Sequence, residues 1–167
     1  LCVASSELVA IQKMLNAHIN SFWRVIGALG CSGLVLSLAS GADQPQWGET
    51  FSRNMVSSER DLPETFNPET GENLKWSARL GTESHSTPVI AHGRVLIGTN
   101  NGEPRDPKHK GDRGILMCFD EKTGAFLWQL AVPKLTNSIY WDWPRAGICS
   151  TATVEGDRVY IVSNRGE

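Results

Sequence analysis

Short apolar runs separated by turn residues dominate the second half of the chain. The clearest example spans residues 115–130, where two apolar stretches flank Asp120-Glu121-Lys122-Thr123-Gly124. An Asp side chain can accept hydrogen bonds from nearby backbone amides, and Gly adopts positive φ at the end of a turn or bulge. Each apolar run has the length of a strand and is too short for a typical helix. The pattern therefore predicts a β-hairpin.

The same alternation predicts further strands on either side of this hairpin. His92-Gly93 and Gly156-Asp157 are two-residue turn signals, and Pro88 favours the start of a strand because it has no backbone N–H to donate. Residues 100–113 are expected to form a polar loop. The expected strands are residues 74–79, 86–91, 94–99, 115–119, 125–130, 151–154 and 158–163.

The chain also contains an internal repeat. Residues 85–103 align without a gap to residues 149–167, at an offset of 149 − 85 = 64, and pair Ser86 with Ser150 and Asn100 with Asn164. Residues 70–76 match residues 123–128 with one residue inserted. Repeated units of short strands indicate an array in which each unit buries its faces against its neighbours. We expect an all-β, partial β-propeller with one complete four-stranded antiparallel blade and parts of two neighbours.

The first 42 residues are typical of an export signal. Arg24 precedes an apolar stretch over residues 25–39, and small residues follow at the cleavage positions. Met14 is the natural initiator on this interpretation, and residues 1–13 are either an over-extended start or the edge of a fragment. An uncleaved signal anchor and lipidation at Cys31 are the alternatives. We expect an exported protein, located in the periplasm or cell envelope or secreted.

The remaining chain divides into two parts. Residues 43–73 are interrupted by Pro and Gly and predict an extended N-terminal arm, lying over the first blade with Trp47 as its anchor. Residues 74–167 hold the repeats, and the second copy stops at Glu167, which predicts truncation at the C-terminus. The net charge is −2 with no basic block, so no nucleic-acid partner is expected. Contact with a membrane is expected only through an uncleaved signal or a lipid anchor.

The turn and the repeat together resemble a known family. Asp120-x-x-Thr123-Gly124-x-x-x-Trp128, followed by Ser150-Thr151 and residues 156–161 (GDRVYI), is similar to the pyrroloquinoline-quinone-like (quinoprotein-like) β-propeller repeat. In that family the turn and the following tryptophan lock one blade to the next. The resemblance implies that Trp128, and Trp76 in the weaker copy, are blade-docking rings, with Asp120, Thr123 and Gly124 shaping the turn.

This resemblance covers residues 74–167 well and residues 47–73 loosely. Gln46-Trp47-Gly48 with Arg53-Asn54 also looks like the start of exported bacterial proteins of this type. The first copy departs from the family pattern, because Asn67 stands where the aspartate is expected. We therefore expect its turn to be held differently.

A quinone-dependent enzyme of this fold would need an aspartate base and a calcium ion held by acidic and amide oxygens. No acidic cluster of that kind can be identified, so no cofactor is expected in this fragment. Pyrroloquinoline quinone and calcium are expected only if the full-length protein is an enzyme. We expect a non-catalytic binding or scaffold module with an envelope or extracellular protein partner. The alternatives are a quinone-dependent alcohol or sugar dehydrogenase and the sensor ectodomain of a signalling protein.

The long connection within residues 133–147 is the best binding candidate. Its aromatic side chains are typical interface anchors, and its charged ones could orient a polar ligand. Alternatively, the rings cover the edge of the blade. The candidate contact residues are Tyr140, Trp141, Asp142, Trp143 and Arg145.

Cysteines and histidines give little further chemistry. Cys118 and Cys149 either form a disulfide in an oxidising compartment or are two small buried side chains in separate strands. Asp106, His109 and Asp112 match no metal-ligand spacing, so we expect them in a surface loop.

Overall fold

The structure is a computed structural model that describes residues 7–10, 42–48, 53, 56–57, 59–137 and 141–167. Regular structure in these ranges is entirely β, and they contain no helix, as predicted. None of them therefore forms a helix that could cross a bilayer. Apart from residues 7–10 and Ala42, the predicted export segment lies outside the described residues, including Arg24 and Cys31, and so does Tyr140.

The described strands form three antiparallel sheets, in the orders β1-β2, β3-β4-β5-β6 and β7-β8. The predicted strands of residues 86–130 are found in their expected order as the central four-stranded sheet. The strands are β1 (Glu7–Ala10), β2 (Trp76–Arg79), β3 (Val89–Ala91), β4 (Arg94–Asn100), β5 (Arg113–Asp120), β6 (Phe126–Pro133), β7 (Thr153–Glu155) and β8 (Arg158–Tyr160).

The four-stranded sheet is buried on both sides, which explains the continuous burial of β4 and β5. Alternate residues of β4 and β5 point to opposite sides, as the period of two requires. One side packs against β2 through Val95, Ile97, Ile115, Met117 and Phe119. The other side carries Val89, Leu96, Leu116 and Cys118, which pack against Ile148 and Ala152 near β7.

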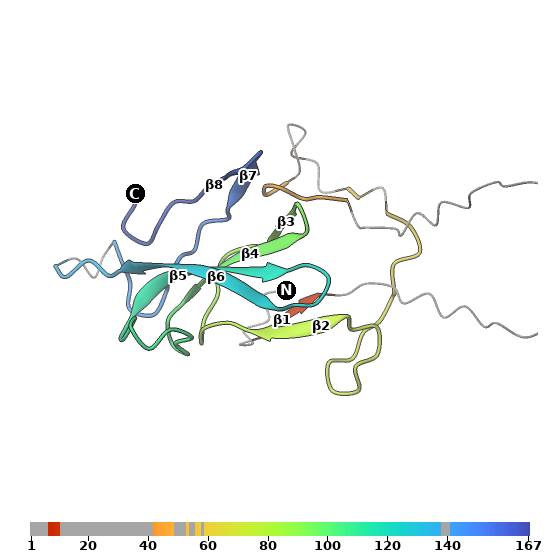
Figure 1. Cartoon of the computed structure of the whole chain (residues 1–167), viewed down its shortest axis with the longest axis horizontal. Coiled ribbons are helices and arrows are strands. Elements are labelled where there is room, and N and C mark those ends of the chain that lie inside the picture. Colours follow the sequence, from red (N-terminus) through yellow and green to blue (C-terminus); the bar gives the residue numbers. More distant parts are fainter. Residues whose placement is uncertain (1–6, 11–41, 49–52, 54–55, 58, 138–140) are drawn as a thin grey trace, which may run out of the picture.

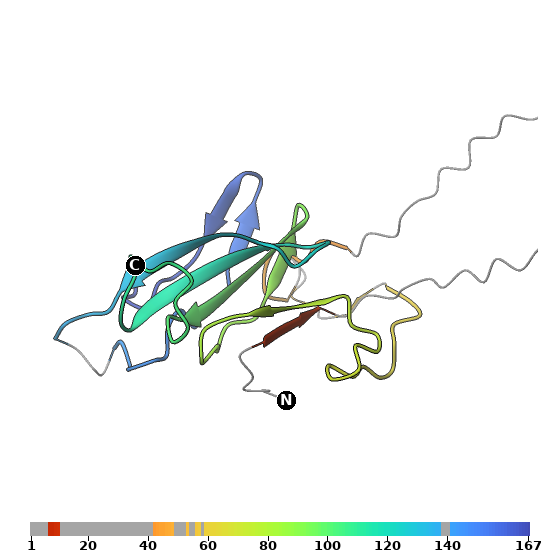
Figure 2. The same ribbon diagram turned by 60° about the horizontal axis from the view of Figure 1, so that its bottom comes forward.

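Figures 1 and 2 show the resulting layers, with β1–β2 on one side of the four-stranded sheet and β7–β8 on the other. The hairpin turn between β3 and β4 has φ of 53° at His92 and 72° at Gly93. Positive φ at both central residues matches the right-handed twist of the flanking strands, so this predicted two-residue turn is confirmed.

The strand β2 has a partner that the sequence did not reveal. β1 pairs with it in an antiparallel register that runs from Glu7 opposite Arg79 to Ala10 opposite Trp76. Residues 74–79 were predicted as a strand, and no partner strand for them was predicted from the sequence. The two segments are separated by more than 60 residues, and no turn signal adjoins β1, so local patterning could not indicate the pairing.

The arm contacts the central sheet through its backbone. Gln44 forms a β-bridge to Ile90 of β3, with N···O distances of 2.7 and 3.0 Å, and the carbonyl of Pro45 accepts a hydrogen bond from Val154 of β7. The arm thus links two sheets. Trp47 is 53% exposed, so its predicted role as the anchor is wrong. Backbone hydrogen bonds hold the arm instead.

The internal repeat is also present in the three-dimensional structure. β7 and β8 begin 64 residues after β3 and β4, the offset of the sequence repeat. Corresponding residues also touch, since Ser86 Oγ donates to the carbonyl of Ser150 at 2.9 Å and the amide of Thr87 donates to Thr151 Oγ1 at 3.4 Å. The seam between the two units is therefore built from equivalent positions.

Candidate functional site

The turn between β5 and β6 is held by the side chain of Asp120. Its Oδ1 accepts hydrogen bonds from the amides of Lys122 and Thr123 at 3.1 and 2.8 Å and from Thr123 Oγ1 at 2.7 Å. Gly124, at a φ of 71°, donates its amide to the Asp120 carbonyl. The hydrogen bonds from Thr123, above all, lower the pKa of Asp120, because they favour the ionised carboxylate. The predicted shaping roles therefore match the geometry.

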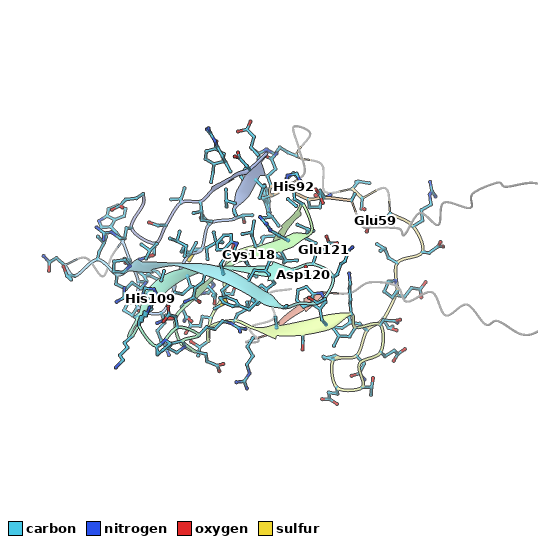
Figure 3. The ribbon with its side chains drawn as sticks, viewed as in Figure 1. Glu59, His92, His109, Cys118, Asp120 and Glu121 are labelled. Atoms are coloured by element: carbon cyan, nitrogen blue, oxygen red, sulfur yellow. The ribbon has the colours of Figure 1, made fainter. Side chains whose placement is uncertain are left out.

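Figure 3 places Asp120 and Glu121 together at one end of β5. Trp76 reaches this turn from β2 and is buried, with 8% of its surface exposed. Its Nε1 donates to the carbonyl of Glu121 at 2.8 Å. A Cβ added to Gly124 would fall 2.6–2.8 Å from atoms of the indole, so the ring lies directly on the glycine. Trp76 thus connects two neighbouring sheets.

The corresponding turn of the first copy is held in the same way, contrary to expectation. Asn67 Oδ1 accepts from the amides of Glu69 and Thr70 at 2.8 and 3.2 Å. The amide of Gly71 donates to the Asn67 carbonyl, and the amide of Asn67 donates to the Glu72 carbonyl. The amide oxygen of Asn67 replaces the carboxylate oxygen of Asp120, because either oxygen can accept these backbone donors.

Trp128, the second predicted docking ring, is 38% exposed in β6. It is paired with Cys118 and therefore lies on the side of the sheet that faces β7. Leu130 lies on the same side and is 44% exposed. Trp128 is therefore less covered than Trp76, of which 8% is exposed, and its predicted docking role stays a prediction.

The long connection places its aromatic residues at the surface. Trp141 is 85% exposed and Trp143 is 67% exposed. The alternative in which these two rings cover the sheet edge is therefore wrong. A pocket of about 490 Å³ lies beside them. It is lined by both indoles together with Asp142, Ala146, Gly147, Cys149, Ser150, Val162, Ser163, Asn164 and Gly166.

Asp142 is the fixed point of this connection. Its side chain is 1% exposed and forms an ion pair with Lys134. The other carboxylate oxygen accepts from the Leu135 amide and from Asn164 Nδ2, both at 2.8 Å. Lys134 also donates to the Trp143 carbonyl at 2.6 Å. The buried charge is therefore paired and hydrogen-bonded, as burial requires.

The electrostatics of Asp142 favour a structural role. Burial alone raises its pKa, but the hydrogen bonds from Lys134, Leu135 and Asn164 and the Lys134 charge outweigh burial, so the pKa lies below the usual range. The carboxylate is thus ionised and both oxygens are engaged. This geometry positions the loop between the two tryptophans rather than offering a base for proton transfer.

Arg145 fixes the other end of the connection. Its carbonyl accepts from Asn100 Nδ2 at 2.7 Å, and its amide donates to Asp112 Oδ2 at 2.6 Å. Its guanidinium lies 3.5 Å from Glu83 in an exposed ion pair. Arg145 therefore joins the connection to the central sheet, while the carboxylate of Asp142 is held by Lys134, Leu135 and Asn164.

The equivalent asparagines Asn100 and Asn164 both hold the connection, one at Arg145 and the other at Asp142. Sequence reasoning did not assign a role to either, nor to Lys134. The available signal was the recurrence of Asn at the same position of both repeats. A polar residue that recurs in a buried repeat position is a candidate for a backbone-holding role.

The cysteines and histidines are the remaining candidates, and Cys149 lines the pocket beside the two tryptophans. Cys118 and Cys149 are both free thiols, and Cys149 is exposed, so neither the disulfide nor the pair of buried side chains is found. His109 lies 3.9 Å from Asp106 at the end of the sheet opposite Asp120, as Figure 3 shows. Across the described ranges, no group of three His, Cys, Asp or Glu side chains is placed to hold a metal ion.

The candidate functional features are thus the two exposed tryptophans, the buried Asp142 between them, and the turn of residues 120–124 that Trp76 contacts. Comparison with protein-family models and with curated proteins gives no match for this chain.

Proposed function

We propose that the stacked sheets are blades of a β-propeller of the quinoprotein-like type. Two features support the proposal. The four-stranded sheet is covered on both sides by sheets of neighbouring units, and Trp76 stacks on Gly124 with its N–H on the Glu121 carbonyl. A large planar ring suits this position because it fills the wedge between two twisted sheets and satisfies its donor on a backbone oxygen.

On this scaffold we propose a non-catalytic binding function outside the cytoplasm, directed to a protein partner in the envelope or extracellular space. The observation that carries it is the exposure of Trp141 and Trp143 on a loop whose centre, Asp142, is buried and ion-paired. Rigid aromatic anchors dominate the binding energy of protein interfaces because little side-chain entropy is lost when they are covered. The pocket beside them would receive an apolar side chain of the partner.

A site-specific photo-crosslinker tests this proposal. Placed at position 141, it should give a discrete adduct in an envelope extract, and excess unlabelled wild-type protein should compete with it. The Trp141→Ala/Trp143→Ala protein should compete much more weakly. A crosslinker at Leu62, which is 58% exposed and distant in sequence, is the matched control.

Two outcomes would contradict the proposal. One is an identical set of adducts from positions 141 and 62, which would indicate nonspecific contact. The other is reduction of an electron-accepting dye by the protein with added pyrroloquinoline quinone and calcium, with an alcohol or sugar as donor. That result would favour a catalytic function over a scaffold.

A further inference from the structure

The sequence contains one Asn-Gly dipeptide, Asn101-Gly102, which directly follows β4 and opens the loop of residues 101–112. Asn-Gly pairs are prone to deamidation, because a backbone nitrogen with no side chain beside it can approach the side-chain carbonyl carbon of the preceding Asn. Here the pair is inside the fold, since Asn101 is only 5% exposed. The chain therefore holds a chemically labile pair in a buried position.

Packing fixes both members of the pair. Asn101 Nδ2 donates to the carbonyls of His109 and Gly111, at 2.7 and 2.8 Å, so this one amide ties the start of the loop to its end. A Cβ added to Gly102 would fall 2.1 Å from Thr82 Oγ1, so no larger residue fits there without a shift. The closed loop thus requires an amide followed by a glycine. Figure 3 labels His109, which marks this loop at the end of the sheet opposite Asp120.

The closed loop also restrains the reaction. The nucleophile would be the backbone nitrogen of Gly102, and its N–H donates to Asn100 Oδ1 at 3.0 Å. The leaving group would be Nδ2 of Asn101, and both of its hydrogens are engaged. The low exposure of the pair keeps out the solvent base that must remove the Gly102 proton. Deamidation therefore requires that the loop first opens locally.

We propose that Asn101 is a modification site, at which opening of the loop of residues 101–112 permits deamidation and the product keeps the loop from closing again. The Gly102 nitrogen loses its proton to solvent and forms a bond to Cγ of Asn101. The Cγ–Nδ2 bond breaks and ammonia leaves, which gives a succinimide. Water then adds to either ring carbonyl and opens the ring to aspartate or isoaspartate. One water is consumed for each ammonia released, and no oxidant or reductant is needed.

Neither product can restore the closed loop. An aspartate carries only acceptors, so its two oxygens would face the carbonyls of His109 and Gly111 with no hydrogen between them. Buried acceptors without donors are costly, which favours the open loop. Isoaspartate also inserts a carbon atom into the backbone and displaces the Gly102 amide from Asn100.

Opening of the loop also affects the long connection of residues 133–147. Asn100, next to the dipeptide, donates to the carbonyl of Arg145 at 2.7 Å. Asp112, at the far end of the loop, accepts from the amide of Arg145 at 2.6 Å. Both ends of the loop therefore support the same residue. Deamidation should loosen the connection at Arg145, whether or not its tryptophans bind a partner.

Peptide mass spectrometry of the 167-residue chain, incubated at neutral and mildly alkaline pH, measures the reaction. A synthetic peptide of residues 97–106 serves as the unfolded reference. Asn101 should be converted in both, but about 10-fold or more slowly in the folded chain, because opening breaks at least three hydrogen bonds. Fragmentation that distinguishes aspartate from isoaspartate should find both products.

Asp112→Ala tests the requirement for opening without changing the dipeptide. This variant removes one support of the loop, so it should accelerate both deamidation and hydrogen exchange of the Gly102 amide. Asp157→Ala is the matched control, because the Asp157 side chain is 98% exposed, and it should change neither rate. Low concentrations of urea should raise the two rates of the wild type in parallel.

Asn101→Asp reproduces one product directly. Its amides over residues 103–112 should exchange faster than those of the wild type, and trypsin should cleave faster after Lys108 and Lys110. Exchange over residues 115–119 of β5 should stay slow, which shows that the sheet is folded. Asn137→Asp, at an exposed asparagine, should leave all of these rates unchanged.

Three results would overturn the proposal. One is deamidation of Asn101 in the folded chain as fast as in the peptide. The second is a deamidation rate that stays constant while exchange of the Gly102 amide is accelerated. The third is an Asn101→Asp protein whose loop exchanges and is cleaved like that of the wild type.

Discussion

The ring of Trp76 lies on Gly124 so closely that a Cβ at that glycine would fall 2.6 Å from the indole. The contact joins β2 to the turn between β5 and β6, across 124 − 76 = 48 positions of the sequence. Two independent requirements favour glycine at position 124. The backbone there has a positive φ, and the Trp76 ring needs a surface without a side chain.

Gly124→Ala should therefore destabilise the protein more than Gly71→Ala. At Gly71 the added methyl meets no described atom, so only the left-handed backbone is penalised, by about 1 kcal/mol. At Gly124 the ring must also move, which adds about 1–3 kcal/mol. Urea unfolding of both variants at low protein concentration measures the difference. Equal free energies of unfolding would show that the ring does not lie on the glycine in solution.

The turn of Asp120 should make stability depend on pH at the acidic end. Because the folded-state pKa of Asp120 is lowered, its contribution is present above the unfolded pKa and is lost as the pH falls through the lower folded value. Asp120→Asn should reduce the loss of stability below about pH 4. At neutral pH it should fold like the wild type, since Asn67 holds the equivalent turn, whereas Asp120→Ala should melt at a lower temperature. Thermal melts from neutral to acidic pH compare the three proteins, and parallel curves for wild type and Asp120→Asn would refute the assignment.

Removal of the carboxylate of Asp142 should be strongly destabilising. Asp142→Ala leaves Lys134 without its ion-pair partner in a largely buried position, at a cost of about 3 kcal/mol. Lys134→Ala should be costly for the same reason, and the double variant should lose less than the sum of the two. A double-mutant cycle by urea unfolding measures this coupling. Additive losses would mean that the pair is not formed in solution.

The two thiols should react at very different rates. Cys149 is exposed and Cys118 is fully buried in β5, so iodoacetamide should modify Cys149 in the native protein and Cys118 only after unfolding. Desolvation raises the pKa of both thiols, so the reaction of Cys149 should be slow at neutral pH and accelerate as the pH rises. Peptide mass spectrometry in the absence and presence of urea identifies the modified residue. Rapid native labelling of Cys118 would contradict the packing of the sheet.

Much of the fold follows from local pattern. The four central strands were predicted because short apolar runs and turn residues are short-range signals. β4 and β5 are buried throughout because both sides of the sheet are covered. The predicted strand ends were less accurate than the predicted strands themselves. Residues 158–163 were expected to be one strand, whereas β8 ends at Tyr160.

Long-range contacts account for what the sequence did not reveal. One carboxylate oxygen of Asp142 pairs with Lys134, and the other accepts a hydrogen bond from Asn164, which is 22 residues away. Spacing alone could not bring these side chains together. The prediction that the Asn67 turn is held differently was wrong for a chemical reason. Asn and Asp both carry a side-chain oxygen that can accept hydrogen bonds from the turn amides. Backbone pairing of β1 with β2 is likewise invisible to local pattern.

The contact between Ser86 and Ser150 has a consequence for how such an array grows. Donor and acceptor occupy the same place in two successive units. A gene duplication that copies one unit therefore supplies both sides of the new seam at once, without a compensating second mutation. Only the donor position requires serine, because the acceptor is a backbone carbonyl that any residue supplies.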